Sequence, residues 1–270
     1  MKRLVVLNKN VGETPLSAIH AWKVKNSEYK NVPASYAGRL DPMASGKLLI
    51  LLGDECKRQR EYTNLDKEYE IEVLLDIGSD TGDVLGMPRY ADKETTLDSV
   101  DADAVFKTEI GAHMREYPAF SSKTVNGKPL FLHTLEKSLP YMVVPEHIER
   151  IYNIQHLGTY TISDSELITK VTALLDLAPR TNEPSKRLGE DFRIDSIREK
   201  WEQLFESVHE RNFVVIRLKV TCGSGTYMRS LAGRIGKSLR TNALALSISR
   251  TRIGRYIPLW NSAGFWFSTY

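Results

Sequence analysis

The last 60 residues, Arg211–Tyr270, contain no acidic side chain. This segment carries ten basic residues, whereas residues 1–210 carry 27 basic and 34 acidic ones. Closely spaced cations repel one another unless a partner neutralises them, so the segment is predicted to face a polyanion. A phosphodiester backbone is the first candidate. The alternative is a solvated basic face whose cations pair with acids of the preceding 210 residues.

Cysteines and long hydrophobic runs are also scarce. Only Cys56 and Cys222 are present, too few for a disulfide framework and typical of a reducing compartment. The longest purely aliphatic run, Leu48–Leu52, is far shorter than a membrane span. The apolar stretch Leu4–Leu7 is too short for a signal peptide. We therefore expect a soluble, cytoplasmic protein without membrane association.

Several common catalytic and binding sites are excluded by spacing. The six histidines form no HxxxH pair and the cysteines form no CxxC pair, which argues against a metal site. The glycines at 223–228 and 231–238 lack the spacing of dinucleotide-binding and Walker A loops. Asp80 and Asp83 share a glycine-rich turn, where two acids more often form a solvated turn than a cation site. We expect neither a metal nor a cofactor.

Hydrophobic periodicity predicts strands and helices without strict βαβ alternation, which favours an α+β fold in a single domain over residues 1–270. Strands are expected at about residues 4–8, 48–52, 68–77, 216–222 and 244–249, with a strand pair near 148–162. Helices are expected at about residues 15–24, 92–113, 164–177, 195–210 and 228–239.

Two of these helices, 164–177 and 195–210, are expected to form a separate module. Ser196-x-x-Glu199 has the spacing of a capping box at the start of the second helix. The polar residues at 179–191 are predicted to link the two helices. The mixed surface charge of this module favours simple bulk over extra RNA contacts as its role.

Asp41 is the best chemical candidate in the chain. It lies in "SYAGRLDPMASGKLLILLGDECK", residues 35–57, on a turn punctuated by glycine and proline that leads into the apolar run Leu48–Leu52. An aspartate in a loop is most often a turn former that bonds to its own backbone. Here the apolar flanks should hold the turn against a core, so that the carboxylate is presented rigidly at the mouth of a sheet.

The stretch around Asp41 resembles the catalytic motif of the TruB family of pseudouridine synthases, G-H-T-G-x-L-D-P-x-A-x-G-x-L followed by an aliphatic strand. Four further stretches are similar to motifs of that family, in the same order: "KEYEIEVLLDIGSDTGDVLG" at 67–86, "YPAFSSKTVNGKPLF" at 117–131, "VTCGSGTYMRSLAGRIGKSL" at 220–239 and "ISRTRIGRY" at 248–256. The resemblance implies the pseudouridine synthase fold, with a central mixed, mostly antiparallel sheet flanked by helices and long loops.

The resemblance also implies a reaction, the isomerisation of uridine 55 in the T-loop of tRNA to pseudouridine. Asp41 matches the family's nucleophile, and a carboxylate is ionised at neutral pH without a separate base. Arg229 matches the arginine that forms a salt bridge with it, and Tyr69 matches the tyrosine that stacks on the flipped-out base. Without the resemblance, Tyr69 and Arg229 are an ordinary strand aromatic and a surface helix arginine. Attack at the sugar C1′ and attack at the base C6 both stay open.

The predicted RNA-binding residues surround this site: Lys9, Tyr36, Arg39, Lys123, Arg250 and Arg252. Tyr36 stands where the family has a histidine, so stacking on RNA is expected in place of a hydrogen bond. The implied partner is the T-arm stem-loop of tRNA, bound by a monomer with no obligatory protein partner.

The chain stops soon after the last motif, so no C-terminal PUA domain is expected. The module at 164–210 is expected as an insertion, because many relatives have a shorter connection there. Two alternatives stay open. One is a guide-dependent pseudouridine synthase, which would need partner proteins and a guide RNA. The other is a non-catalytic tRNA-binding or tRNA-folding protein that kept the surface after losing the chemistry.

Overall fold

The computed structural model describes residues 2–91, 94–96, 102–179, 193–208, 210–259 and 263–270. Within these residues nine strands form one sheet: β1 (Leu4–Lys9), β2 (Ala34–Ala37), β3 (Ala44–Leu52), β4 (Asp66–Leu75), β7 (Gly111–Glu116), β10 (Glu146–Ser163), β11 (Asn212–Cys222), β12 (Ala243–Pro258) and β13 (Gly264–Thr269). Two short hairpins lie outside it: β5 (Ile77–Ser79) with β6 (Pro88–Tyr90), and β8 (Thr124–Val125) with β9 (Lys128–Pro129).

The main path of the sheet runs β1-β3-β12-β4-β11-β10-β7, with β2 added to β3 and β13 added to β12. Only the pairing of β12 with β3 is parallel among these neighbours, and the others are antiparallel. The expected mixed, mostly antiparallel sheet of an α+β fold is therefore confirmed.

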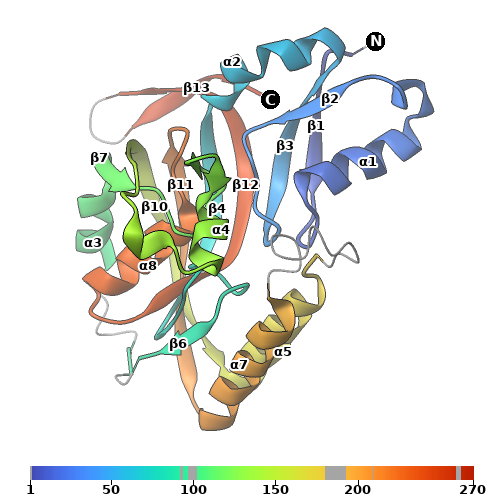
Figure 1. Ribbon diagram of the computed structural model, residues 1–270. Helices are drawn as coiled ribbons and strands as arrows, with labels where there is room; N and C mark the ends of the chain where they lie inside the picture. Colours follow the sequence, from blue (N-terminus) through green and yellow to red (C-terminus); the bar gives the residue numbers. More distant parts are fainter. Residues whose placement is uncertain (1, 92–93, 97–101, 180–192, 209, 260–262) are drawn as a thin grey trace.

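Helices surround this sheet: α1 (Pro15–Lys25), α2 (Gln59–Thr63), α3 (Ala102–Glu109), α4 (Leu130–Leu135), α5 (Asp164–Asp176), α7 (Ile194–Ser207) and α8 (Met228–Ser238). Figure 1 shows α1 beside β1, α4 in front of the central strands and α5 beside α7 at the bottom, and α8 packs against β12 and β4. Among the described residues, no helix combines the length and apolar character needed to cross a membrane.

The strand pair predicted near residues 148–162 is a single strand, β10, of 18 residues. It stays continuous because β7 pairs with its first part and β11 with the rest. The register of its ladder with β11 is irregular at Ile151/Asn153 and at His156/Gly158.

The helix predicted over 92–113 is shorter in the structure. It ends at Glu109, and Gly111 at φ +123° begins β7. Residues 92–93 and 97–101 of the predicted helix lie outside the described residues. At the other end of the chain, β12 continues beyond the predicted 244–249 because β13 pairs with its last part.

Contrary to expectation, α5 and α7 do not form a separate module. Their apolar faces share one buried cluster with the sheet residues Leu74, Val215 and Leu246. In the middle of that cluster Trp201 is 1% exposed, and its Nε1–H donates to the Val84 carbonyl at 3.0 Å. The helices therefore complete the core at one end of the sheet.

The predicted capping box at Ser196 is also wrong. The helix α7 already begins at Ile194, with Arg193 as its N-cap residue in the left-handed region at φ +59°, so Ser196 lies inside the first turn. A capping box is found instead at α5, between Ser163 and Glu166. Apart from Pro179, the linker predicted at 179–191 lies outside the described residues.

The shared core makes a stability prediction. Trp201→Ala is expected to lower the free energy of unfolding by about 3–5 kcal/mol, because it leaves a cavity and removes the hydrogen bond to the Val84 carbonyl. Urea denaturation measures this loss. The matched control is Trp22→Ala, since Trp22 on α1 is only half-buried and should cost less. Two separate unfolding transitions in the variant, with α5 and α7 melting alone, would contradict a shared core.

Candidate active site

Asp41 lies on the loop between β2 and β3. Its neighbours Leu40 and Met43 are 4% and 6% exposed, so they anchor this loop in the core. Gly46, at φ +104°, allows β3 to approach β12, because a Cβ there would lie 2.3 Å from the Arg250 carbonyl oxygen. The Asp41 side chain itself remains 38% exposed. The loop is thus fixed while its carboxylate can be reached from outside.

Arg250 fixes the backbone of this loop through hydrogen bonds to its carbonyl groups. The residue is 1% exposed. Its guanidinium donates three hydrogen bonds to carbonyl oxygens, from Nε to Lys47 at 2.7 Å, from Nη1 to Arg39 at 3.1 Å and from Nη2 to Gly38 at 3.2 Å. All of these bonds go to protein backbone. The structure therefore corrects the prediction that Arg250 binds RNA and gives it a positioning role.

Lys9 holds the same loop from the other side. It too is 1% exposed, and its Nζ donates to the carbonyls of Asn10 and Glu13 at 2.8 Å and of Pro42 at 3.3 Å. Burial lowers the pKa of Lys9 to about 8, against the opposing effects of Glu13 and Asp41. A side chain enclosed in this way cannot reach a phosphate, so the predicted RNA contact of Lys9 is likewise corrected.

Arg229, in the first turn of α8, meets Asp41 across 188 residues of sequence. Its Nε donates to Asp41 Oδ2 at 2.7 Å, its Nη1 to the Thr81 carbonyl at 2.5 Å and its Nη2 to the Phe120 carbonyl at 3.0 Å. The side chain is 7% exposed, so it is not a surface helix arginine. Burial opposes its charge, but Asp41 and Asp83 outweigh burial and raise the pKa of the guanidinium.

Asp83 is a second carboxylate beside Arg229, and sequence reasoning did not assign it to the site. Its Oδ2 lies 3.7 Å from the Arg229 Nε, and its Oδ1 accepts hydrogen bonds from Thr81 Oγ1 at 2.6 Å and Leu85 N at 3.1 Å. It is 5% exposed, and burial raises its pKa although Arg229 acts against this. The signal that could have found it is its place in the motif at 67–86.

The prediction of a solvated turn at Asp80 and Asp83 is wrong. Asp80 Oδ2 pairs with Arg193 Nη1 at 2.9 Å, and Asp83 is buried, so the turn is not simply solvated. Over the described part of the chain, no group of three or more His, Cys, Asp or Glu side chains could hold a metal ion.

Tyr69, on β4, lies opposite Arg250 on β12. It is 8% exposed and belongs to the main apolar cluster. Burial raises the pKa of its hydroxyl, and Asp41 is close enough to contribute in the same direction. Tyr69 is thus the strand neighbour of Arg250, which binds carbonyls of the Asp41 loop. Its stacking on a flipped-out base stays a prediction.

The other predicted RNA contacts are partly or fully accessible. Arg39 and Lys123 are exposed, and Lys123 Nζ lies 4.8 Å from the centre of the Tyr117 ring. Arg252 is 49% exposed, although its Nε lies 3.4 Å from Glu68 Oε1. Tyr36 is half-buried on β2 and packs against the main apolar cluster. Their binding to RNA stays a prediction.

The acid-free segment is less available to a polyanion than its sequence suggests. Five of its ten cations pair with carboxylates of the preceding residues: Arg211, Lys219, Arg229, Arg234 and Arg252. The other five have no carboxylate within 4.0 Å among the described residues: Arg217, Lys237, Arg240, Arg255 and Arg250, the last of which binds backbone carbonyls. The alternative of internal pairing therefore holds for half of these cations.

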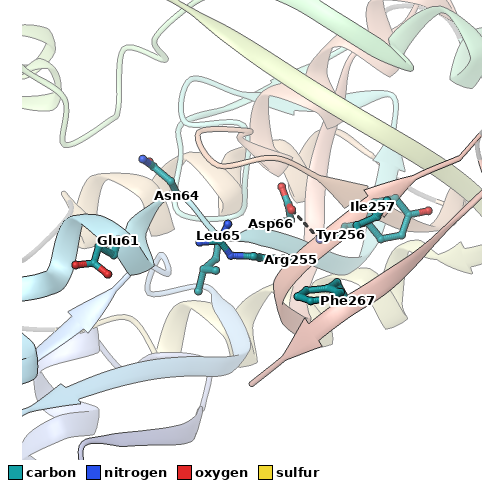
Figure 2. Close-up of a pocket in the computed structure, with 8 residues that line it drawn as sticks. All are labelled: Glu61, Asn64, Leu65, Asp66, Arg255, Tyr256, Ile257 and Phe267. Carbon is teal, nitrogen blue, oxygen red and sulfur yellow. Dashed lines mark hydrogen bonds between the residues drawn. The ribbon is translucent and has the colours of Figure 1, made fainter.

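A pocket of about 440 Å³ lies beside α2 and the β12–β13 hairpin. Figure 2 shows its lining residues: Glu61, Asn64, Leu65, Asp66, Arg255, Tyr256, Ile257 and Phe267. The Asp66 carboxylate accepts a hydrogen bond from the Tyr256 backbone at 2.8 Å there. Asp41, Tyr69 and Arg229 do not line this pocket, so it is distinct from the candidate active site.

Comparisons with known proteins agree with the motif pattern. Residues 27–173 match the family described as TruB family pseudouridylate synthase (N terminal domain). The tRNA pseudouridine synthase B of Borreliella burgdorferi is 26% identical over 254 residues, covering 93% of this chain and 70% of that protein. The tRNA pseudouridine synthase 4 of Saccharomyces cerevisiae is 25% identical over 253 residues, covering 85% of this chain but only 63% of its own length.

One solved structure shares the fold. It is a chain of a Cbf5-Nop10-Gar1 complex, with a TM-score of 0.52 and 18% sequence identity. The match covers 93% of the present chain and 48% of that one, so the chain spans about half the length of this structural relative.

Proposed function

Because the chain belongs to the TruB family of pseudouridylate synthases, we propose that it isomerises uridine to pseudouridine in tRNA. The observation that carries the proposal is the ion pair between the buried Arg229 and the partly exposed Asp41, at 2.7 Å. It gives one carboxylate a fixed position and an accessible face. The names of the relatives from Borreliella burgdorferi and Saccharomyces cerevisiae support tRNA as the substrate.

Asp41 is the proposed nucleophile. Arg229 binds its Oδ2, and its Oδ1 has no hydrogen-bond partner among the described residues, so this oxygen is free to attack C1′ or C6 of the target uridine. The bond between C1′ and N1 then breaks, the base turns, and a bond between C1′ and C5 forms. N1 gains a proton, C5 loses one, and Asp41 leaves unchanged. Because the product is an isomer of the substrate, the reaction needs no oxidant or reductant.

The substrate is proposed to be the T-arm of tRNA, with position 55 flipped out toward Asp41. Tyr69 would stack on that base, while the exposed Arg39 and Lys123 would contact phosphates. We place the protein in the cytoplasm as a monomer that acts without a guide RNA or partner protein. Residues 1–270 are proposed to act as one catalytic domain, with 164–210 as an insertion.

The experiment that tests this function uses the purified protein alone with an unmodified tRNA transcript, followed by mapping of pseudouridine. Product at position 55 supports the stand-alone enzyme. Product that appears only after a guide RNA and partner proteins are added would select the guide-dependent alternative. Tight binding without product would select the non-catalytic tRNA-binding protein.

The affinity for tRNA is expected to depend on salt. With about four phosphate contacts, the slope of log K against log [salt] should be about −3, which is on the order of 50-fold weaker binding at 200 mM than at 50 mM salt. Fluorescence anisotropy with labelled tRNA measures this slope.

Single substitutions should change the salt slope at cations without a carboxylate partner and leave it unchanged at cations that already pair with one. Arg39→Ala removes an exposed cation with no carboxylate within 4.0 Å among the described residues, and should reduce the slope by about one. Lys219→Ala is the control, because Lys219 Nζ already pairs with Glu70 Oε1 at 3.3 Å. A slope near zero for the unchanged protein would remove the electrostatic part of the proposal.

A further inference from the structure

We propose that Arg193, the N-cap residue of α7 within the helical insertion, is a positioning residue that holds Arg229 in place. The inference rests on the proposed isomerase function and assigns the insertion a role beyond bulk or RNA contact. It is carried by contacts of a single side chain with two loops, and those two loops supply the carbonyl groups that bind Arg229.

The first contact is with the turn that follows β5. Arg193 Nη1 donates to Asp80 Oδ2 at 2.9 Å, and both side chains are largely buried, at 26% and 19% exposure. The other oxygen, Asp80 Oδ1, accepts a hydrogen bond from the Met87 backbone at 2.8 Å. The next residue, Thr81, offers its carbonyl to Arg229 Nη1. Arg193 thus holds the turn at Asp80, one residue before the carbonyl that accepts a hydrogen bond from Arg229.

The second contact is with the segment between β7 and α4. The guanidinium carbon of Arg193 lies 4.8 Å from the centre of the Phe120 ring, a cation–π distance. The carbonyl of the same Phe120 accepts a hydrogen bond from Arg229 Nη2 at 3.0 Å. Arg193 therefore contacts both loops whose carbonyl oxygens accept hydrogen bonds from Arg229. A shift of either loop would move the guanidinium that fixes Asp41.

The backbone of Arg193 is itself firmly anchored. Its carbonyl accepts the hydrogen bond from Ile197 N at 3.0 Å, and the neighbouring Ile194 is 5% exposed. Arg193 adopts φ +59°, a conformation that glycine or asparagine meets at lower cost. An arginine at this strained position is therefore explained by the contacts of its guanidinium with Asp80 and Phe120.

The test compares two arginines of α7 and its N-cap. Arg193→Ala is expected to lower kcat for an unmodified tRNA by roughly ten- to a hundredfold, because a small misplacement of catalytic groups has an effect of this order. KM should change little, since the loss falls on the catalytic step. Arg193→Lys should recover part of the rate, because lysine can pair with Asp80 but cannot stack its charge as a planar group on Phe120.

Arg198→Ala is the matched control. Arg198 lies on the same helix, pairs with Asp176 Oδ1 at 2.7 Å and is 24% exposed, close to the value for Arg193. Arg198 links α7 to α5 and, among the contacts of the described residues, makes none with the two loops that bind Arg229. This variant should keep the kcat of the unchanged protein.

A second readout does not depend on activity. The hydrogen exchange of the Arg229 Nε–H, assigned in NMR spectra by its loss in Arg229→Lys, should become faster in Arg193→Ala and stay unchanged in Arg198→Ala. Should Arg193→Ala fail to fold, Phe120→Leu removes the stacking surface while keeping the carbonyl, and the same acceleration is expected.

The outcomes separate the two proposals. An unchanged protein that makes no pseudouridine overturns the proposed function, while the exchange measurement still tests the contact. An active protein in which Arg193→Ala matches Arg198→Ala in kcat and in exchange overturns the positioning role. A raised KM with unchanged kcat overturns it too, because that result assigns Arg193 to direct RNA contact.

Discussion

Asp41→Asn is expected to abolish pseudouridine formation, with a rate at least about 10³-fold lower than that of the unchanged protein. The amide keeps the size of the side chain, and its oxygen can still accept a hydrogen bond from Arg229 Nε. It cannot act as a nucleophile in this reaction, since it carries no negative charge. Single-turnover assays on unmodified tRNA measure the rate, and fluorescence anisotropy measures the binding, which should persist.

The control for this substitution is Asp54→Asn, which removes one negative charge from an exposed carboxylate that pairs with Lys57. Its activity should match that of the unchanged protein. An Asp41→Asn variant that still forms pseudouridine would mean that another group is the nucleophile. Loss of both product and binding would place Asp41 in substrate binding instead.

Arg229→Leu is expected to lower the free energy of unfolding by about 3 kcal/mol at neutral pH and to eliminate activity. Removing one partner of a buried ion pair leaves the other charge without compensation. That charge belongs to Asp83, which is 5% exposed, whereas Asp41 is 38% exposed and can still be solvated. Urea denaturation followed by circular dichroism measures the loss.

The effect of Arg229→Leu should depend on pH in a defined direction. Burial already raises the pKa of Asp83, and loss of the neighbouring cation raises it further. The folded variant then binds a proton that the unfolded chain has released, so its stability falls as pH rises through this range. The deficit should therefore be smaller at pH 5 than at pH 8, and Arg229→Leu/Asp83→Asn should recover part of it. A deficit independent of pH would mean that Asp83 is not the charge left uncompensated.

The elements with a strong apolar pattern could be predicted from the sequence. Leu48–Leu52 forms the end of β3 as expected. On α8 the side chains of Met228, Leu231 and Ile235 face the core, also as expected. Periodicity works in these places because burial of one face determines the local structure. It failed for β10, where two different neighbours cover one long strand in turn.

The pairing of Asp41 with Arg229 could be predicted only through the family resemblance, because no local pattern links residues 188 positions apart. The roles of Lys9 and Arg250 could not be predicted in the same way. A lysine or arginine near a motif of an RNA-modifying family suggests contact with phosphate. Both side chains, however, are buried and bind backbone carbonyls. Whether a cation faces solvent depends on how distant loops cover it, and composition does not contain that information.

Charge counting met the same limit. The segment Arg211–Tyr270 has no acid of its own, but the sheet places its strands against acidic ones, as Lys219 against Glu70 and Arg252 against Glu68 show. A one-signed segment can therefore be the complement of another part of the same chain. In this protein, part of the charge difference between residues 1–210 and residues 211–270 is used in ion pairs that join the two segments.

The parallel pairing of β12 with β3 has a consequence for the order of events on the ribosome. The motif that carries Asp41 emerges early, but Arg250, which binds the carbonyls of its loop, lies about 200 positions later in the chain. Contacts between segments so far apart form slowly, because a long chain must first close. The loop that carries Asp41 would thus lack its hydrogen bonds to Arg250 until the final strands have been synthesised and have joined the sheet.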